Sequence, residues 1–112
     1  MKKILFLLSL LLMTAGCGKD DESTTTPVAC FTFTSPETTV FVGDLVEFNN
    51  CSTDADSYSW DFGDGSTSTE KNPTHSFDES KQFDVVLVAH GKGDQPKTDT
   101  TMLPITVWKK AK

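Results

Sequence analysis

Apolar and polar residues alternate along most of the chain from residue 28 onward. Such alternation puts one set of side chains on each face of an extended strand, as a half-buried β-strand requires. Turn-forming residues separate the alternating segments, and none of them shows a helical period. The segments are ACFTFTS (29–35), TTVFVG (38–43), DLVEFNNCS (44–52), DSYSWDF (56–62), KQFDVVLVAH (81–90) and TMLPITVW (101–108). Short strands at this spacing predict an all-β fold, a two-layer β-sandwich over residues 28–108.

The first residues depart from this pattern. Lys2 and Lys3 precede an apolar run from Ile4 to Met13, which is much shorter than the roughly 20 residues that span a bilayer. A short apolar run behind a positively charged start is typical of a secretory signal peptide, here residues 1–16. A buried core helix is the alternative interpretation.

Residues Thr14-Ala15-Gly16-Cys17 resemble the lipobox of bacterial lipoproteins, in which Leu usually stands at the position of Thr14. The resemblance implies cleavage before Cys17 and acylation of that cysteine, for example with palmitate. Acyl chains hold a protein in a membrane at roughly 0.8 kcal/mol per buried CH₂. An ordinary signal peptide followed by an unmodified Cys17 is the alternative.

A polar, Thr-rich stretch follows, so residues 17–27 are expected to form a flexible tether. Within it, Lys19 precedes the acidic run 20–22. This resembles the export tag of a group of Gram-negative surface lipoproteins, which implies a lipid-anchored protein on the outer face of the outer membrane. The alternative is a solvated charged linker.

The charge of the chain bears on its partners. The formal net charge is −6 at neutral pH, and the sequence contains no Arg. Nucleic-acid binding requires clustered Lys and Arg to displace counterions. Here the lysines are scattered, with three of them in a short tail at residues 109–112. Nucleic acid is therefore not expected as a partner.

Two cysteines remain once Cys17 is assigned to a lipid. Cys30 lies on the strand face opposite Phe31 and Phe33, and Cys51 lies opposite the face of Phe48. If the two strands pair antiparallel through the turn region 38–43, both sulfur atoms reach the same outer face. A disulfide that closes a loop of about 20 residues would contribute roughly 3 kcal/mol. Two free thiols are the alternative.

The stretch SWDFGDGSTSTEKNPTHSF (59–77) carries a family resemblance. WDFGDG and NPTHSF, with an alternating strand after them, resemble the polycystic-kidney-disease (PKD) domain over about Ala29 to Val107. The matching motif residues are Trp60, Asp61, Phe62, Gly63, Asp64, Gly65, Asn72, Pro73, Thr74 and His75. The resemblance implies an immunoglobulin-like β-sandwich of the kind found in extracellular proteins.

The sequence departs from the family's usual pattern in two places. Ser80-Lys81-Gln82-Phe83 replaces a turn that usually contains Pro-Gly before a Tyr. Val86 and Val88 stand where the outer strand face usually carries Thr. Two exposed apolar residues could dock on a neighbour, or this face could be covered within the sheet or under a loop.

Residues 60–65 can also be explained without the family, as a strand that ends in a sharp corner. Trp60 and Phe62 share parity and should point inward, while Gly63 and Gly65 permit backbone angles that a Cβ disfavours. Asp61 and Asp64 can accept bonds from nearby backbone amides. These features predict a structural corner without a cofactor. The alternative is calcium, bound by Asp61 and Asp64 with help from Asp54 and Asp56.

No pattern of residues indicates an enzyme. His75 is expected to bond to the backbone at a turn, and His90 is expected to be solvated at the start of a Gly-rich loop. No nucleophile elbow and no His-Glu-x-x-His spacing occurs in the sequence.

We therefore expect a non-enzymatic binding or spacer module that contacts an extracellular protein or carbohydrate. Trp108 is the one aromatic residue that looks free to hold a glycan. A passive structural accessory subunit of an outer-membrane complex, with no ligand of its own, is the alternative.

Overall fold

Two β-sheets packed face to face form the molecule in this computed structural model, which describes residues 25–94 and 96–111. The all-β prediction is confirmed, since every regular element in these residues is a strand. Among the described residues there is accordingly no helix long and apolar enough to cross a membrane. The predicted signal peptide, Cys17 and the start of the predicted tether lie outside the described residues.

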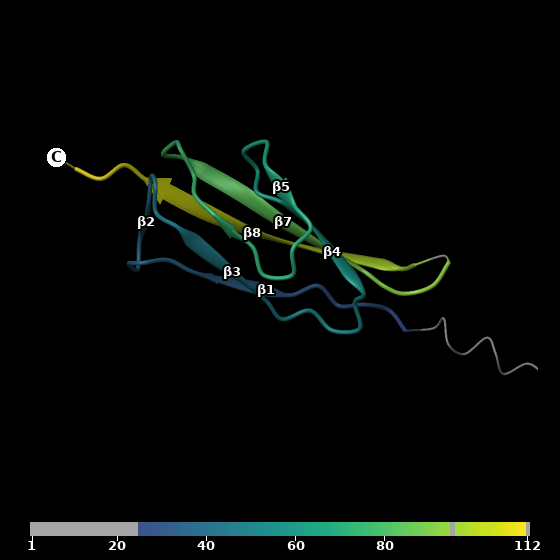
Figure 1. Ribbon diagram of the computed structural model, residues 1–112. Coiled ribbons are helices and arrows are strands. Elements are labelled where there is room, and N and C mark those ends of the chain that lie inside the picture. Colours follow the sequence, from purple (N-terminus) through teal and green to yellow (C-terminus); the bar gives the residue numbers. More distant parts are fainter. Residues whose placement is uncertain (1–24, 95, 112) are drawn as a thin grey trace, which may run out of the picture.

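One sheet has three strands and the other has five. The smaller sheet has the order β1 (Phe31–Thr34), β3 (Val46–Asn50) and β6 (Thr74–His75). The larger has the order β2 (Val40–Phe41), β8 (Thr98–Trp108), β7 (Gln82–His90), β4 (Ser57–Asp61) and β5 (Thr67–Ser68). All neighbouring strands are antiparallel except β2 and β8, which run parallel. Figure 1 shows β1 and β3 in one layer and β4, β7 and β8 in the other.

The connection between β1 and β3 contains a short strand. Residues 38–43 were expected to form such a strand and to connect these two paired strands, but the partner of this strand in the other sheet was not predicted. In the structure, β2 leaves the smaller sheet and pairs with β8, with Val40 opposite Val107. The pairing of β1 with β3 is nevertheless antiparallel, as expected, with Phe33 opposite Phe48.

The alternation in the sequence decides which side chains fill the space between the sheets. Each long strand sends every second residue inward, and the inward residues form one continuous apolar core. Its buried members are Phe31, Val40, Val46, Phe48, Trp60, Phe62, Phe77, Phe83, Val85, Leu87, Ile105 and Val107. Phe33, Tyr58 and Leu103 pack against this core and are partly buried.

A disulfide joins Cys30, just before β1, to Cys51, just after β3. The two Cα atoms are 4.8 Å apart, and the amide of Cys51 donates a hydrogen bond to the carbonyl of Cys30 at 2.9 Å. The predicted bridge is confirmed, and the alternative of two free thiols is wrong. Because 21 residues separate the cysteines, the cross-link contributes about 3 kcal/mol by restricting the unfolded chain.

Candidate functional site

Trp60 ends the apolar face of β4, immediately before the corner. Its side chain is only 2% exposed and contacts the ring of Phe31 edge-on, with 5.0 Å between the centroids. The indole Nε1 donates a hydrogen bond to the backbone oxygen of Glu70 at 2.7 Å. The single polar atom of this buried side chain therefore has a partner, and Trp60 fixes the segment after β5 to the core.

Two glycines allow the chain to turn after Phe62. Gly63 has φ +84°, and a Cβ at this position would lie 2.8 Å from the backbone oxygen of Asp84 in β7. Gly65 has φ +94°, but no atom lies within 4 Å of where its Cβ would be. Gly63 is thus needed for both its backbone angles and its close approach to β7, whereas Gly65 is needed for its backbone angles alone.

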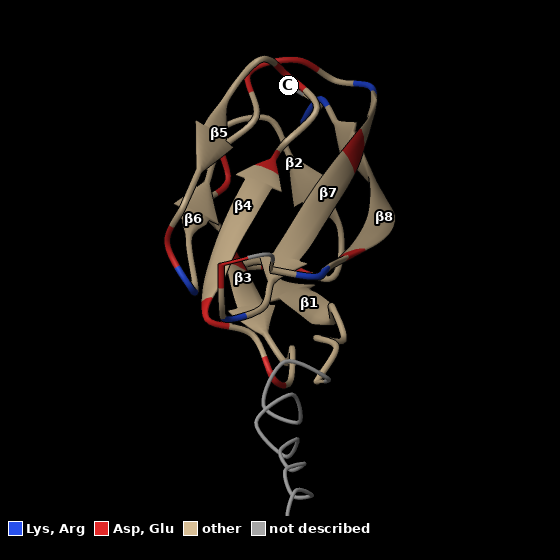
Figure 2. Cartoon of the chain, turned by 90° about the vertical axis from the view of Figure 1, so that its right-hand side faces the viewer, with Lys and Arg blue, Asp and Glu red and all other residues tan. Residues whose placement is uncertain are grey.

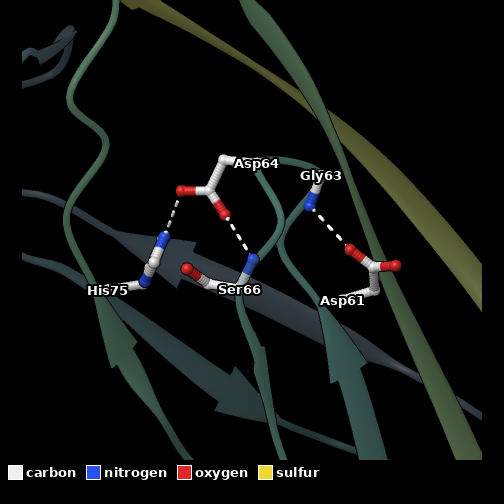
Figure 3. Close-up of polar contacts among 5 residues, drawn as sticks. All are labelled: Asp61, Gly63, Asp64, Ser66 and His75. Carbon is white, nitrogen blue, oxygen red and sulfur yellow. Dashed lines mark hydrogen bonds and ion pairs between the residues drawn. The ribbon is translucent and has the colours of Figure 1, made fainter.

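The carboxylates of the corner accept hydrogen bonds from its backbone (Figure 3). Asp61 Oδ1 accepts from the amide of Gly63 at 2.9 Å, and Asp64 Oδ1 accepts from the amide of Ser66 at 3.0 Å. Each bond reaches two residues forward, which is the pattern of Asp in turns. Phe62 and Ser66 close the loop with a backbone bond of 3.0 Å.

His75 connects this corner to the smaller sheet. Its Nε2 lies 2.7 Å from Asp64 Oδ2 (Figure 3), and its ring stacks on Phe62 with 4.2 Å between the centroids. The expectation of a backbone bond at a turn was wrong. His75 lies opposite Val46 in the pairing of β6 with β3, and this places its ring against the aromatic core, where Asp64 is within reach.

The environment of Asp64 changes its titration. Partial burial raises the pKa of the Asp64 carboxyl, but hydrogen bonds from His75 and the Ser66 amide, together with the charge of a protonated His75, lower it by more. The pKa of Asp64 therefore lies below its ordinary value of 3.8. A carboxyl with a lower pKa in the folded state stabilises that state above the unfolded pKa, and this stability is lost as the pH falls through the folded pKa.

We expect Asp64→Asn to reduce the loss of stability between about pH 5 and pH 3, because the variant has no carboxyl to protonate there. Urea midpoints measured at both pH values would show a smaller drop for the variant than for the parent protein. Asp94→Asn, in the exposed loop between β7 and β8, is the matched control and should keep the parental drop. A drop in Asp64→Asn as large as that of the parent protein would contradict the conclusion that the pKa of Asp64 is lowered in the folded state.

The calcium alternative gains no support from this geometry. Asp61 and Asp64 each direct one oxygen to a backbone amide, and the second oxygen of Asp64 contacts His75. Asp54, one of the proposed helpers, adopts φ 58° in the loop before β4. No three His, Cys, Asp or Glu residues within 25–94 and 96–111 come together as metal ligands would.

His90 lies in a different place from the one expected. It is the last residue of β7 and is only partly exposed, with Nε2 2.9 Å from the hydroxyl of Ser59 in β4. A Ser–His contact can serve nucleophilic catalysis when an oxyanion-binding site lies beside it. Here, Ser59 lies within β4, opposite Val88 of β7, so the contact joins side chains of two paired strands. The contact fits the packing of two strands.

The outer face of the larger sheet is formed by the residues of β4, β7 and β8 that point away from the core. Val86 and Val88 are half-buried there and line a shallow hollow of about 300 Å³ together with Ser59, Asp61 and residues 67–69. In β8, Met102 is 53% exposed and Trp108 is 57% exposed. The two valines are therefore partly covered, while the expectation that Trp108 is exposed agrees with the structure.

The fold and the corner both match those of a known family. A family model described as a PKD domain matches residues 24–107. The chain belongs to the PKD domain family. The match includes all eight strands except Trp108, the last residue of β8, together with the corner from Trp60 to Gly65.

Solved structures with the same fold include other PKD domains. The PKD1 domain of the *Vibrio cholerae* metalloprotease PrtV is 32% identical, with a TM-score of 0.61, and the match covers 76% of this chain and 100% of that one. The PKD1 domain of *Vibrio anguillarum* Epp is 31% identical, with a TM-score of 0.62, and the match covers 77% and 98%.

A structure of carbohydrate-binding modules from the β-sandwich superfamily, described as promiscuous in specificity, is also similar. It is 29% identical with a TM-score of 0.64, and the match covers 76% of this chain and 35% of that one. The likeness therefore spans most of this chain and about a third of that one.

The curated relatives are much longer proteins. Collagenase ColQ1 of *Bacillus cereus* is 47% identical over 47 residues, which are 41% of this chain and 5% of the collagenase. Pre-pro-metalloprotease PrtV of *Vibrio cholerae* is 43% identical over 58 residues, 47% of this chain and 6% of PrtV. The likeness is thus confined to a small part of each relative.

Proposed function

We propose that this chain is a non-catalytic surface lipoprotein whose single PKD domain binds, or spaces apart, extracellular proteins or carbohydrates. In this proposal, the signal peptide (1–16) is removed, Cys17 is acylated, and residues 18–27 hold the domain away from the outer membrane. The export-tag resemblance at residues 19–22 supports an orientation toward the cell exterior. The family membership and the disulfide both suit an extracytoplasmic location.

The observation that carries the binding role is the outer face of the larger sheet. It exposes more than half of the surface of Met102 and of Trp108, whereas Ile105 and Val107 on the opposite face of β8 lie in the core. Contiguous apolar surface on a small domain is typical of an interaction site, and the exposed Pro104 extends this surface between Met102 and Trp108. The likeness to carbohydrate-binding modules supports the same role.

A non-catalytic role is supported by the corner itself. Trp60 and Phe62 fill the core, Asp61 and Asp64 hold the turn, and His75 joins the two sheets. Each residue of the family motif that could take part in chemistry thus has a structural contact, and the PKD domains among the similar structures are single modules of larger proteins.

The location is tested on intact Gram-negative cells that express the full chain. Protease added outside should release peptides of residues 28–108, identified by mass spectrometry, and a clickable fatty acid should label the parent protein but not Cys17→Ala. Full protection from the protease in cells that remain intact would contradict surface exposure. Absence of label on the parent protein would contradict lipidation.

The binding role is tested separately with a glycan array and with a pull-down from outer-membrane extract. Retention of a glycan or of a specific protein by the full chain would support a binding module. If both assays were empty, the domain would be a passive spacer or accessory subunit.

A further inference from the structure

We propose that the outer face of the larger sheet binds a neutral polysaccharide chain, with Trp108 as its aromatic anchor. This inference rests on the proposed binding function and adds to it the surface and the class of ligand. It follows from the shape of the face, the side chains on it, its charges and its area.

The face offers a row of side chains along β8. Met102, Pro104, Thr106 and Trp108 all point outward from β8, since the residues between them point toward the core. Successive outward residues on a strand are about 6.8 Å apart, so the row is about 20 Å long. A row of this length can contact several consecutive rings of an extended polymer.

Trp108 has the features of an anchor. Its side chain is 57% exposed, whereas that of Trp60 is 2% exposed in the core, so the fold does not account for a large ring at position 108. A flat indole offers an apolar face to the C–H side of a sugar ring and an N–H donor at its edge.

Polar groups that suit sugar hydroxyls lie beside the row. Gln82 is opposite Thr106 in the pairing of β7 with β8, and both side chains are exposed. An amide supplies two donors and one acceptor, and a hydroxyl supplies one donor and can accept as well. These groups lie within the same stretch of the face as Trp108.

The charges near this end are mixed, which suits a ligand without charge, since the exposed Lys109 lines a shallow hollow together with Asp78 and Glu79. Lys110 pairs with Glu37 at 3.1 Å and lies over the ring of Phe41, which is opposite Trp108 in the sheet. Lys81 pairs with Glu79 at 3.7 Å. Asp84 lies opposite Pro104 on the outer face, and Figure 2 shows most other charged positions in loops and at strand ends. An anionic polymer would meet Asp84 and a chain of net charge −6.

The area of the proposed site also favours a polymer over a second folded protein. About 20 Å of β8 and the width of two strands, β8 and β7, at about 4.8 Å spacing give an area on the order of 200 Å². A stable protein complex usually buries about 800 Å² on each partner. A small site can still hold a repetitive polymer firmly when many copies on one membrane bind the same chain.

Affinity electrophoresis of the full chain in detergent micelles tests this proposal, with gels containing starch, mannan, mixed-linkage β-glucan or xylan. At least one of these neutral polysaccharides should retard the protein, while anionic polygalacturonate should not. Trp108→Ala should weaken the retardation by about tenfold or more, and Trp108→Phe should restore part of it. Leu45→Ala is the matched control, because Leu45 is 52% exposed beside the smaller sheet.

Fluorescence gives a second readout that depends on the same residue. Iodide quenches exposed indoles, so it should report on Trp108 while Trp60 remains shielded. The retarding polysaccharide should protect Trp108 from iodide. If a polysaccharide binds but Trp108→Ala binds equally well, the binding function stands and this surface is wrong. If only a protein partner or only polygalacturonate is bound, the ligand class is wrong.

Discussion

Replacing Trp60 by alanine is expected to lower the free energy of unfolding by about 4 kcal/mol, as truncation of a fully buried aromatic side chain does. The variant loses the ring contacts with Phe31 and Phe48 and the hydrogen bond to the Glu70 carbonyl. Since domains of this size have only about 5–15 kcal/mol of stability, much of the variant should unfold on mild heating. Urea unfolding followed by far-ultraviolet circular dichroism measures the change.

Two further variants show how much of this loss comes from the indole hydrogen bond and how much depends on burial of the tryptophan. Trp60→Phe keeps an aromatic ring in the core but leaves the Glu70 carbonyl without the indole donor, so it should cost about 2 kcal/mol. Trp108→Ala removes an exposed indole and should change stability by less than about 0.5 kcal/mol. Equal effects of alanine at positions 60 and 108 would show that the corner tryptophan does not hold the core.

Gly63→Ala is expected to destabilise the domain by about 4 kcal/mol, for two reasons that add. An L-residue at φ +84° is strained by about 1–2 kcal/mol, and its Cβ would lie 2.8 Å from the carbonyl oxygen of Asp84. Relief of that contact requires the corner to move away from β7, at a cost of about 1–3 kcal/mol. The shift in the urea midpoint gives the total.

Gly65→Ala separates the two reasons. Gly65 has a similar positive φ, but its Cβ would meet no atom within 4 Å, so only the conformational cost of about 1–2 kcal/mol should remain. The difference between the two alanine variants measures the close approach of the corner to β7. Equal destabilisation by both variants would argue that the approach to Asp84 adds nothing.

The features that depend on neighbouring residues could be predicted from the sequence. The alternation of Phe83, Val85, Leu87 and Ala89 is enough to identify the buried face of β7, because strand side chains alternate with a period of two. The backbone angles of the two glycines and the turn hydrogen bonds of Asp61 and Asp64 likewise depend on residues close in the chain. The position of Cys30 and Cys51 relative to the apolar faces was enough to suggest their bridge.

The features that depend on how distant strands meet could not be predicted. His75 contacts Asp64 because β6 pairs with β3 in a particular register, and His90 contacts Ser59 because β7 pairs with β4. Alternation fixes the face on which a side chain lies but leaves open its partner on another strand. β5 and β6 are two residues long, too short to produce an alternating signal.

The disulfide has a mechanical consequence. Residues 31–50, which contain β1, β2 and β3, lie inside the loop that Cys30 and Cys51 close. Tension applied between the two ends of the domain, which lie at opposite ends of the sandwich (Figure 1), therefore passes from Cys30 to Cys51 through the covalent bond. While that bond is intact, a pulling force cannot extend these three strands, and the length that the domain can gain on stretching is shorter by that loop.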